Sequence, residues 1–481
     1  MSTRVTSKKL AKNLILSVLA QIISLATGFI LNFLVPKFID EFQYSYWQSY
    51  VLYVSYVGVL HFGLLDGIVL RYSQYDYDEL DKPKIRSQFQ LLLIFTSLLT
   101  FVACVVTAFL FGNVTKIVII LVACGIITKN IFTYTSYSYQ ITNRISKYAI
   151  LVISQKAVYA IIVIILLLFK VNNFIFYCIA DLIGDVVAVL LGMIYNRGMY
   201  FGKTLPIKEV LKEGKINVSA GILLMIANLS SSLIVGGAKM ITQYKWDTLT
   251  FGKVSFSFSA TNLFLTFVTA ISVVLFPSLK RMDESELPSV YKKIRNAISP
   301  LLFLSLICYF PLCKILKMWL PKYGVSLNYL GILLPIIIFS SKVSLLTNNY
   351  LKAYRKEKIM LLINVISVGL GIGLFSLSAF AFKSLNLLLY CVVIINIVRS
   401  VASEIVVMNL TKNNFIIDFL VELIMTAGFI VCVQLFTLKI GCLIYAILML
   451  AYFGVYYKSI SELLKGFKKS KNKKEEINGE N

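Results

Sequence analysis

Long apolar runs follow one another along almost the whole chain, and this pattern restricts the possible folds more than any other feature. Each run is close to the length that an α-helix needs to cross the hydrocarbon core of a bilayer. Charged or Pro- and Asn-containing breaks separate the runs. We expect about fourteen transmembrane helices, over residues 13–35, 46–70, 87–111, 116–138, 148–169, 174–195, 217–236, 250–276, 297–319, 327–350, 359–381, 384–408, 416–437 and 439–457.

The composition indicates that lipid is the solvent for most of the chain. Hydrophobic residues make up 58% of the 481 residues and charged residues 15%, whereas soluble domains average about 45–50% apolar and 25% charged residues. The first run is long enough to span and lacks a small-residue cleavage motif, so we interpret it as a transmembrane helix rather than a leader. The eight cysteines lie in or beside apolar runs, which predicts packing roles and no metal site or disulfide framework.

The positions of Lys and Arg predict the orientation. With the N-terminus in the cytoplasm, the inner loops and termini carry roughly three times as many Lys and Arg residues as the outer loops. Both termini are therefore expected inside, and this bias explains the net charge of +24 without nucleic acid as a partner. The last segment, 458–481, is Lys-rich and then acidic, and we expect it to lie against anionic lipid.

An internal repeat indicates two related lobes. The fourth and tenth expected helices end in YQITNRISKYAILVISQ (139–155) and YLKAYRKEKIMLLINVIS (350–367), and each carries one lysine shortly before, Lys129 and Lys342. Parallel repeats of this kind are common in transporters. The predicted fold class is an all-α, polytopic membrane helical bundle with two six-helix lobes, 1–202 and 203–411, a helix pair, 412–457, and a cytosolic tail, 458–481.

Basic residues lie within the apolar runs, where one Lys costs about 2.5–3.5 kcal/mol on insertion scales. Lys129 and Lys342 are each roughly 20 Å from the end of the helix, too far for the side chain to reach the inner surface. This cost is tolerable if the side chains line a hydrated cavity that receives an anion. The candidates for this central cationic cavity are Lys129, Lys342, Lys156, Arg71, Arg399, Lys253 and Lys239.

Pairing with nearby acids is the alternative to a cavity role. For Lys129 and Lys342 the acid would have to come from another helix. Asp181 and Asp185 are four residues apart and share one helix face, so they are candidates for coupling to protons or sodium, together with Asp66, or partners for basic residues. The pairs expected under this alternative are Asp66 with Arg71, Glu404 with Arg399, and Asp181 or Asp185 with Lys156.

The fourth expected helix is unusually polar along NIFTYTSYSYQITN (130–143). A helix with hydroxyl or amide groups on nearly every side does not face lipid all round. Asn130, Tyr134 and Tyr137 are candidates for stacking on a sugar or hydrogen bonding to it, with polar packing between helices as the alternative. The chain has no G-x-S-x-G or H-E-x-x-H motif and a single histidine, His61, for which a core role is expected, so we predict neither an enzyme nor a cofactor.

Four segments stand out together: FGLLDGIVLRYSQ (62–74), LPIKEVLKEGKINVSAGILL (205–224), FPSLKRM (276–282) and the run LGILLPIIIFSSKVSLLTNNYLKAYRKEKIMLLINVISVGLGIGLF (330–375). They resemble the polysaccharide-repeat and O-antigen flippases of the multidrug/oligosaccharidyl-lipid/polysaccharide exporter superfamily. The resemblance implies a bilobed bundle around a central cationic cavity. It further implies translocation of undecaprenyl-pyrophosphate-linked oligosaccharide by alternating access, in capsule, exopolysaccharide or O-antigen export across a bacterial plasma membrane.

Two other functions stay open. One is a cation-coupled multidrug antiporter of the same superfamily, although the first run has no carboxylate for a cationic cargo. The other is a membrane scaffold without transport. The partners expected with the flippase are the lipid-linked glycan, anionic membrane lipids and polysaccharide polymerase or assembly proteins.

Overall fold

The computed structural model describes residues 7–110, 112–279 and 286–457. Every regular element in these ranges is helical, so the prediction of an all-α, polytopic bundle is confirmed. The expected lipid-contacting tail, 458–481, lies outside the described residues. Two compact units, Met1–Phe256 and Ser257–Asn481, make up the chain. The boundary falls within a helix rather than near residue 202, and the predicted division into sequence repeats stays a prediction.

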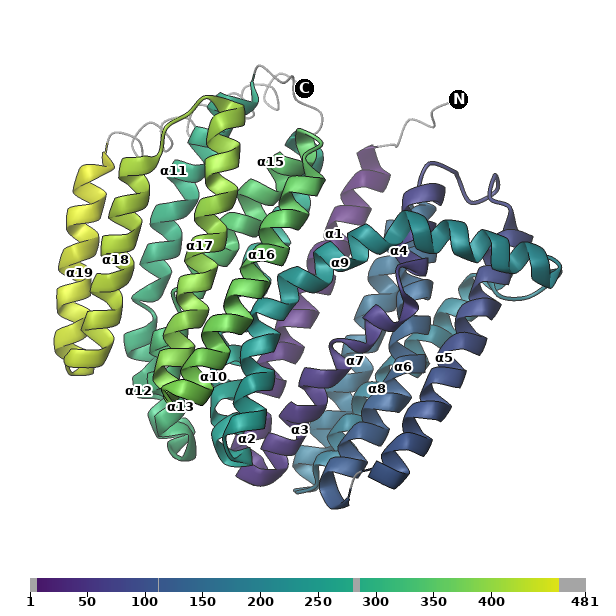
Figure 1. Cartoon of the computed structure of the whole chain (residues 1–481), viewed down its shortest axis with the longest axis horizontal. Helices are drawn as coiled ribbons and strands as arrows, with labels where there is room; N and C mark the ends of the chain where they lie inside the picture. The colour runs from purple at the N-terminus through teal and green to yellow at the C-terminus, as the bar shows by residue number, and fades with distance from the viewer. Residues whose placement is uncertain (1–6, 111, 280–285, 458–481) are drawn as a thin grey trace. The chain divides into compact units, whose positions relative to one another are not determined.

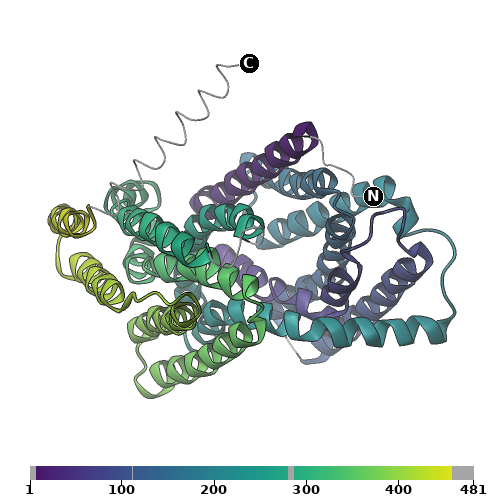
Figure 2. The same cartoon turned by 90° about the horizontal axis from the view of Figure 1, so that it is seen from above.

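The first unit is built mainly of long helices that run close to antiparallel (Figures 1 and 2). A π-helical turn, Ile30–Leu34, joins the first two helices, and a 3-10 turn, Val57–His61, lies between α3 and α4. The helices are α1 Ser7–Phe29, α2 Val35–Phe38, α3 Glu41–Val54, α4 Leu64–Tyr72, α5 Lys82–Leu110, α6 Asn113–Ile141, α7 Ile145–Leu168, α8 Phe174–Tyr195, α9 Ile207–Lys245 and α10 Thr248–Leu279, the last of which crosses the boundary.

The second unit ends in a hairpin of two helices. A π-helical turn, Lys342–Thr347, joins α14 to α15, and another, Leu377–Ala381, extends α16. The helices are α11 Leu287–Leu306, α12 Tyr309–Trp319, α13 Gly324–Leu333, α14 Ile336–Ser341, α15 Asn348–Ala353, α16 Glu357–Ser376, α17 Leu385–Thr411, α18 Ile416–Leu435 and α19 Leu438–Val455.

The helices account for most of the predicted spans. Among the described residues, 11 helices are long and apolar enough to cross a membrane, or up to 13 when each of two bent pairs counts as one span. The remaining predicted run, 250–276, lies in α10, but its side chains from residue 267 onward are outside the described part of the structure, so this span stays a prediction. Exposed side chains on the spans are largely apolar, for example Phe109 and Leu168, as lipid requires.

Two spans are broken for identifiable reasons. α3 with its 3-10 turn meets α4 at 57°, at Phe62 and Gly63, which both have positive φ angles of 50° and 82°. The pair Pro321–Leu333 and Ile336–Ala353 meets at 50°, and Pro335, which has no N–H to continue the helical hydrogen bonds, lies between them. Broken spans of this kind place free backbone groups at membrane depth, where transporters often bind their substrates.

Helix α9 is too long for a single perpendicular span. Its 39 residues correspond to about 58 Å, compared with about 30 Å of hydrocarbon, and it curves along its length (Figure 1). Its first half crosses α4 at very close range. A Cβ on Gly67 would lie 1.8 Å from the carbonyl oxygen of Asn217, and one on Gly221 would lie 2.1 Å from that of Gly63. Glycines therefore permit this crossing.

Candidate functional site

Lys129 lies between two carboxylates in the first unit. Its Nζ is 2.8 Å from Oδ2 of Asp181 and 2.8 Å from Oδ2 of Asp185. Because Asp181 and Asp185 are four residues apart on α8, both carboxylates face the same point on α6. We call these three residues the Lys129 cluster. Its single ammonium cannot neutralise two carboxylates, so the cluster by itself carries one negative charge when all three groups are ionised.

Neighbouring helices complete the polar surroundings of the Lys129 cluster. The Tyr50 hydroxyl on α3 donates to Asp181 Oδ2 at 2.9 Å, and the Gln155 amide on α7 donates to Asp185 Oδ1 at 3.1 Å. Lys156 is the next residue of α7, and within the described residues no carboxylate lies within 4.0 Å of its Nζ. The side chains of Lys129 and Asp181 remain 21% and 11% exposed. The cluster therefore keeps one carboxylate in excess in this conformation and is not fully enclosed.

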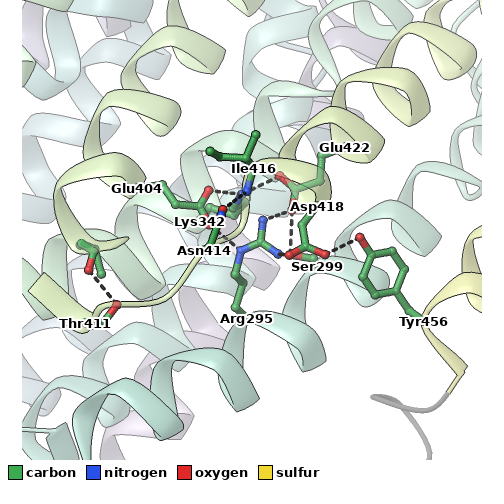
Figure 3. Close-up of polar contacts among 11 residues, drawn as sticks. Arg295, Ser299, Lys342, Glu404, Thr411, Asn414, Ile416, Asp418, Glu422 and Tyr456 are labelled. Atoms are coloured by element: carbon green, nitrogen blue, oxygen red, sulfur yellow. Dashed lines mark hydrogen bonds and ion pairs between the residues drawn. The ribbon is translucent and has the colours of Figure 1, made fainter. Parts of the chain in front are cut away.

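Lys342 belongs to a closed ring of four charged residues in the second unit (Figure 3). Its Nζ lies 2.6 Å from Glu404 Oε2 and 2.6 Å from Glu422 Oε2. The other oxygens of the two glutamates contact Arg295, whose Nε is 2.5 Å from Glu404 and whose Nη2 is 3.0 Å from Glu422. We call these four residues the carboxylate ring. Two cations and two anions make it neutral.

The carboxylate ring joins four parts of the second unit and is almost fully buried. Arg295 comes from α11, Lys342 from the π-helical turn after α14, Glu404 from α17 and Glu422 from α18, and their side chains are only 1–3% exposed. At its edge, Asp418 lies 3.6 Å from Arg295 and accepts a hydrogen bond from the Tyr456 hydroxyl (Figure 3). A neutral, dry ring of this kind holds helices together, and an anion reaches Lys342 only if the ring opens.

Both lysines predicted to line a cationic cavity thus pair with acids from other helices in this conformation. Pairing with acids was the alternative to a cavity role for these two lysines. The two lysines occupy corresponding positions in the predicted repeat, because Lys129 lies on the fourth expected span and Lys342 on the tenth. Their partners Asp181 and Glu404 lie on the sixth and the twelfth expected spans. A direct role of either lysine in binding substrate stays a prediction.

The acid partners expected within a single helix are not those observed. Arg71 donates to Glu213 and Asn217 on α9. Asp66 instead lies 3.7 Å from His61, and these two side chains are buried. Arg399 donates to Asn364 at 2.8 Å, and Glu404 belongs to the carboxylate ring. Residues five apart lie about 140° apart around a helix of 3.6 residues per turn, so neither expected pair can meet. Asp181 and Asp185 contact Lys129, and no described carboxylate lies within 4.0 Å of the Lys156 Nζ.

The remaining predicted residues have separate places. Lys253 lies 3.6 Å from Glu41. Asn130 donates to the carbonyl oxygens of Val57 and Ile126, and the Tyr134 hydroxyl contacts those of Ile85 and Met199, so both hold helices together. Tyr137 packs against the hydrophobic core of the first unit. Contact with a glycan stays a prediction for all three aromatic and amide residues.

Lys239 on α9 differs from the other predicted cations. It is only 8% exposed, and within the described part of the chain no carboxylate lies within 4.0 Å of its Nζ and no hydrogen-bond partner is found. A buried ammonium without a counter-ion is costly. Lys239 therefore has unused capacity to bind an anion in this conformation.

Sequence reasoning missed Arg295 and Glu422. Glu422 is a carboxylate inside the expected span 416–437, and this costly position was a signal that it has a buried partner. The predicted span 297–319 begins after Arg295, whereas α11 begins at Leu287 and therefore includes this residue.

Several solved structures have a similar fold. No family model and no curated protein sequence matches the chain. The structure titled lipid II flippase MurJ, in an inward closed conformation, is similar with a TM-score of 0.70 at 14% identity, covering 93% of this chain and 99% of that one. An inward-facing multidrug resistance transporter of the MATE family has a TM-score of 0.62 at 13% identity, covering 82% and 96%.

A third similar structure is a transporter of the MOP superfamily from Pyrococcus furiosus, whose title reports a binding pocket of reverse polarity. Its TM-score is 0.54 at 11% identity, with coverage of 84% of this chain and 96% of that one. These likenesses show that the chain has the fold shared by MATE and MurJ transporters.

Proposed function

We propose that the chain is a flippase that moves undecaprenyl-pyrophosphate-linked oligosaccharide across a bacterial plasma membrane by alternating access, with both termini in the cytoplasm. The cargo serves capsule, exopolysaccharide or O-antigen export. The observation that carries this proposal is the likeness to a lipid II flippase over 93% of the chain at a TM-score of 0.70. It agrees with the resemblance of the sequence to flippases of lipid-linked saccharides.

The flippase covers more of this chain than the MATE transporter does, 93% compared with 82%. The chain ends its described part in a hairpin of α18 and α19, which have 20 and 18 residues. The hairpin is fixed to the second unit by Glu422, which completes the carboxylate ring.

A diphosphate needs a cation that is not already neutralised, and Lys239 is the best candidate. Lys ammonium groups bind phosphate as point charges, which suits a cargo that moves. Lys239 has no acidic partner within the described residues and is shielded from water. We therefore assign it the first contact with the diphosphate, with Lys156 as a second candidate.

The Lys129 cluster is suited to coupling transport to an ion. It has two carboxylates for one ammonium and is partly exposed, whereas the carboxylate ring is neutral and dry. Uptake of one proton or one sodium ion by Asp181 or Asp185 would remove the excess negative charge and weaken the hold on Lys129. Asp66, close to His61, is the third candidate for ion coupling.

A multidrug antiporter is the second candidate function. The excess of carboxylates around Lys129 favours it, because organic cations bind where negative charge is in excess. If the chain is a scaffold without transport, substitution of any of these charged residues should leave export unchanged.

Deletion of the gene tests the proposal. The lipid fraction of the deletion strain is examined by mass spectrometry, and lipid-linked saccharides are expected to accumulate while the exported polysaccharide disappears. Normal export together with a new sensitivity to organic cations would support the antiporter. Normal levels of lipid-linked saccharide with lost assembly of other membrane proteins would support the scaffold.

A further inference from the structure

The first unit contains a cavity of about 580 Å³ that none of the charged clusters explains. It lies between α3, the start of α6, the end of α9 and the start of α10. Its size is within the range of pockets that hold small molecules, about 300–1,000 Å³. The residues that line it are Tyr46, Ser49, Tyr53, Thr115, Val118, Ile119, Val122, Gln243, Thr248 and Phe251.

The lining is largely apolar, with Val118, Ile119 and Val122 among its residues, and its polar groups carry no charge. Tyr46, Tyr53 and Phe251 supply aromatic surface, and hydroxyl or amide groups come from both tyrosines and from Ser49, Thr115, Gln243 and Thr248. The absence of Lys, Arg, Asp and Glu from this lining disfavours an ion or a phosphate as the ligand. Aromatic faces beside neutral hydrogen-bonding groups are suited to sugars, which present both C–H faces and hydroxyl groups.

Several of these polar groups are unused. Gln243 donates its amide N–H to Ser49 Oγ at 2.9 Å, but its Oε1 is buried and has no hydrogen-bond partner within the described chain. The hydroxyls of Tyr53, Thr115 and Thr248 likewise have no partner in the part of the chain that the structure describes. A buried acceptor without a partner is costly and rare, and Gln243 Oε1 is thus an open acceptor position for a hydrogen-bond donor in the cavity.

We propose that this cavity binds an uncharged, polyhydroxylated group and that this group is the glycan of the cargo. The proposal rests on the proposed flippase function and deepens it. Lys239 lies four residues before Gln243 on α9 and therefore on the same helix face. Diphosphate at Lys239 and sugar at Gln243 would thus bind to adjacent positions, in the order in which the two groups are linked in such a lipid.

Native mass spectrometry of the purified full-length protein in detergent tests the cavity. The protein is offered two lipids in competition: undecaprenyl pyrophosphate without a sugar, and the lipid-linked saccharides extracted from source cells that lack the gene. The wild type is expected to retain the sugar-bearing lipids preferentially. Each lost hydrogen bond is worth about 0.5–1.5 kcal/mol, so the variant Tyr53→Phe/Thr115→Val should reduce this preference about tenfold without changing the binding of undecaprenyl pyrophosphate.

Two further variants make the result decisive. Gln243→Leu removes the unpaired acceptor and should reduce the preference in the same way, although it also removes the hydrogen bond to Ser49. Thr107→Val is the matched control, because Thr107 on α5 bonds only within its own helix, to the carbonyl oxygen of Ala103. The Thr107→Val variant should prefer sugar-bearing lipids as strongly as the wild type does.

The two proposals can fail separately. A wild-type protein that retains sugar-bearing lipids, with an unchanged preference in Tyr53→Phe/Thr115→Val, overturns the cavity proposal alone. A wild-type protein that retains neither lipid overturns the proposed function, and the cavity proposal with it. A wild type that retains both lipids equally overturns the cavity proposal.

Discussion

Glu422 Oε2 lies 2.6 Å from Lys342 Nζ, deep inside the second unit. The contact joins α18, in the C-terminal hairpin, to the π-helical turn inside the broken span Pro321–Leu333 and Ile336–Ala353. π-helical turns inside α-helices frequently mark functional sites. Here the turn begins at the lysine itself, so the backbone irregularity and the buried charge coincide.

Glu422→Gln should destabilise the second unit strongly. The substitution leaves Lys342 and Arg295 with Glu404 as the only carboxylate of the ring, and breaking a buried ion pair in this way costs about 3–5 kcal/mol. Thermal unfolding in detergent, followed by reaction of the buried thiols Cys313 and Cys432 with a dye, measures the change. Glu286→Gln, at an exposed position, is the control and should leave the Tm unchanged.

A double variant separates lost charge balance from lost packing. Lys342→Met/Glu422→Gln leaves Arg295 with Glu404, so the remaining ring is neutral. Its loss of stability should be smaller than the sum of the two single losses, by about 1–3 kcal/mol. Additive losses would show that the two residues act independently.

Gly221→Ala should destabilise the first unit. The new Cβ would lie 2.1 Å from the carbonyl oxygen of Gly63 and 2.2 Å from the amide nitrogen of Gly67, and the backbone cannot rotate out of the way. Forced overpacking costs about 1–3 kcal/mol or more. Gly58→Ala is the control, because a Cβ there meets nothing within 4 Å. The Tm of both variants, measured through the buried thiol of Cys178, decides whether this crossing is as tight as described.

Lys239→Ala should reduce export of the saccharide at normal protein levels in the membrane. The variant removes the buried ammonium assigned to the diphosphate, and a charge-assisted hydrogen bond is worth about 1.5–3 kcal/mol, or 10- to 100-fold in affinity. Lys245→Ala, at an exposed position on the same helix, is the control. Equal export in the two variants would remove Lys239 from the binding site.

Asp181→Asn should slow transport and weaken its dependence on pH if the Lys129 cluster couples transport to protons. The amide cannot take up a proton, and Asp185 alone then faces Lys129, so the variant has no excess carboxylate in this cluster. Transport by the wild type and the variant is compared over a series of external pH values at a fixed sodium concentration. Matching rates at all pH values would exclude Asp181 from coupling.

The spans could be predicted from the sequence because their signal is local. Length and apolarity alone identify a membrane helix, and thirteen of the expected runs have counterparts among the spans when each bent pair counts as one. The breaks at Gly63 and Pro335 were not predicted, although both residue types are known to interrupt helices.

The partners of the buried charges could not be predicted in the same way. Lys342 meets Glu404 and Glu422, which are 62 and 80 residues away along the chain, and Arg71 meets Glu213 at a separation of 142. Such pairs depend on which helices are neighbours, a property that no single apolar run contains. The sequence did place Asp181 and Asp185 on one face, and that face does meet a lysine.

Transport by the purified protein tests the central claim most directly. The protein is reconstituted into liposomes that contain undecaprenyl-pyrophosphate-linked saccharide, and a membrane-impermeant enzyme added outside reports how much of the sugar reaches the outer leaflet. The account predicts that the protected fraction becomes accessible faster than in protein-free liposomes, and that Lys239→Ala slows this transfer. If the protected fraction of sugar is the same with and without the protein, and the same liposomes export an organic cation dye, the proposed flippase function is contradicted.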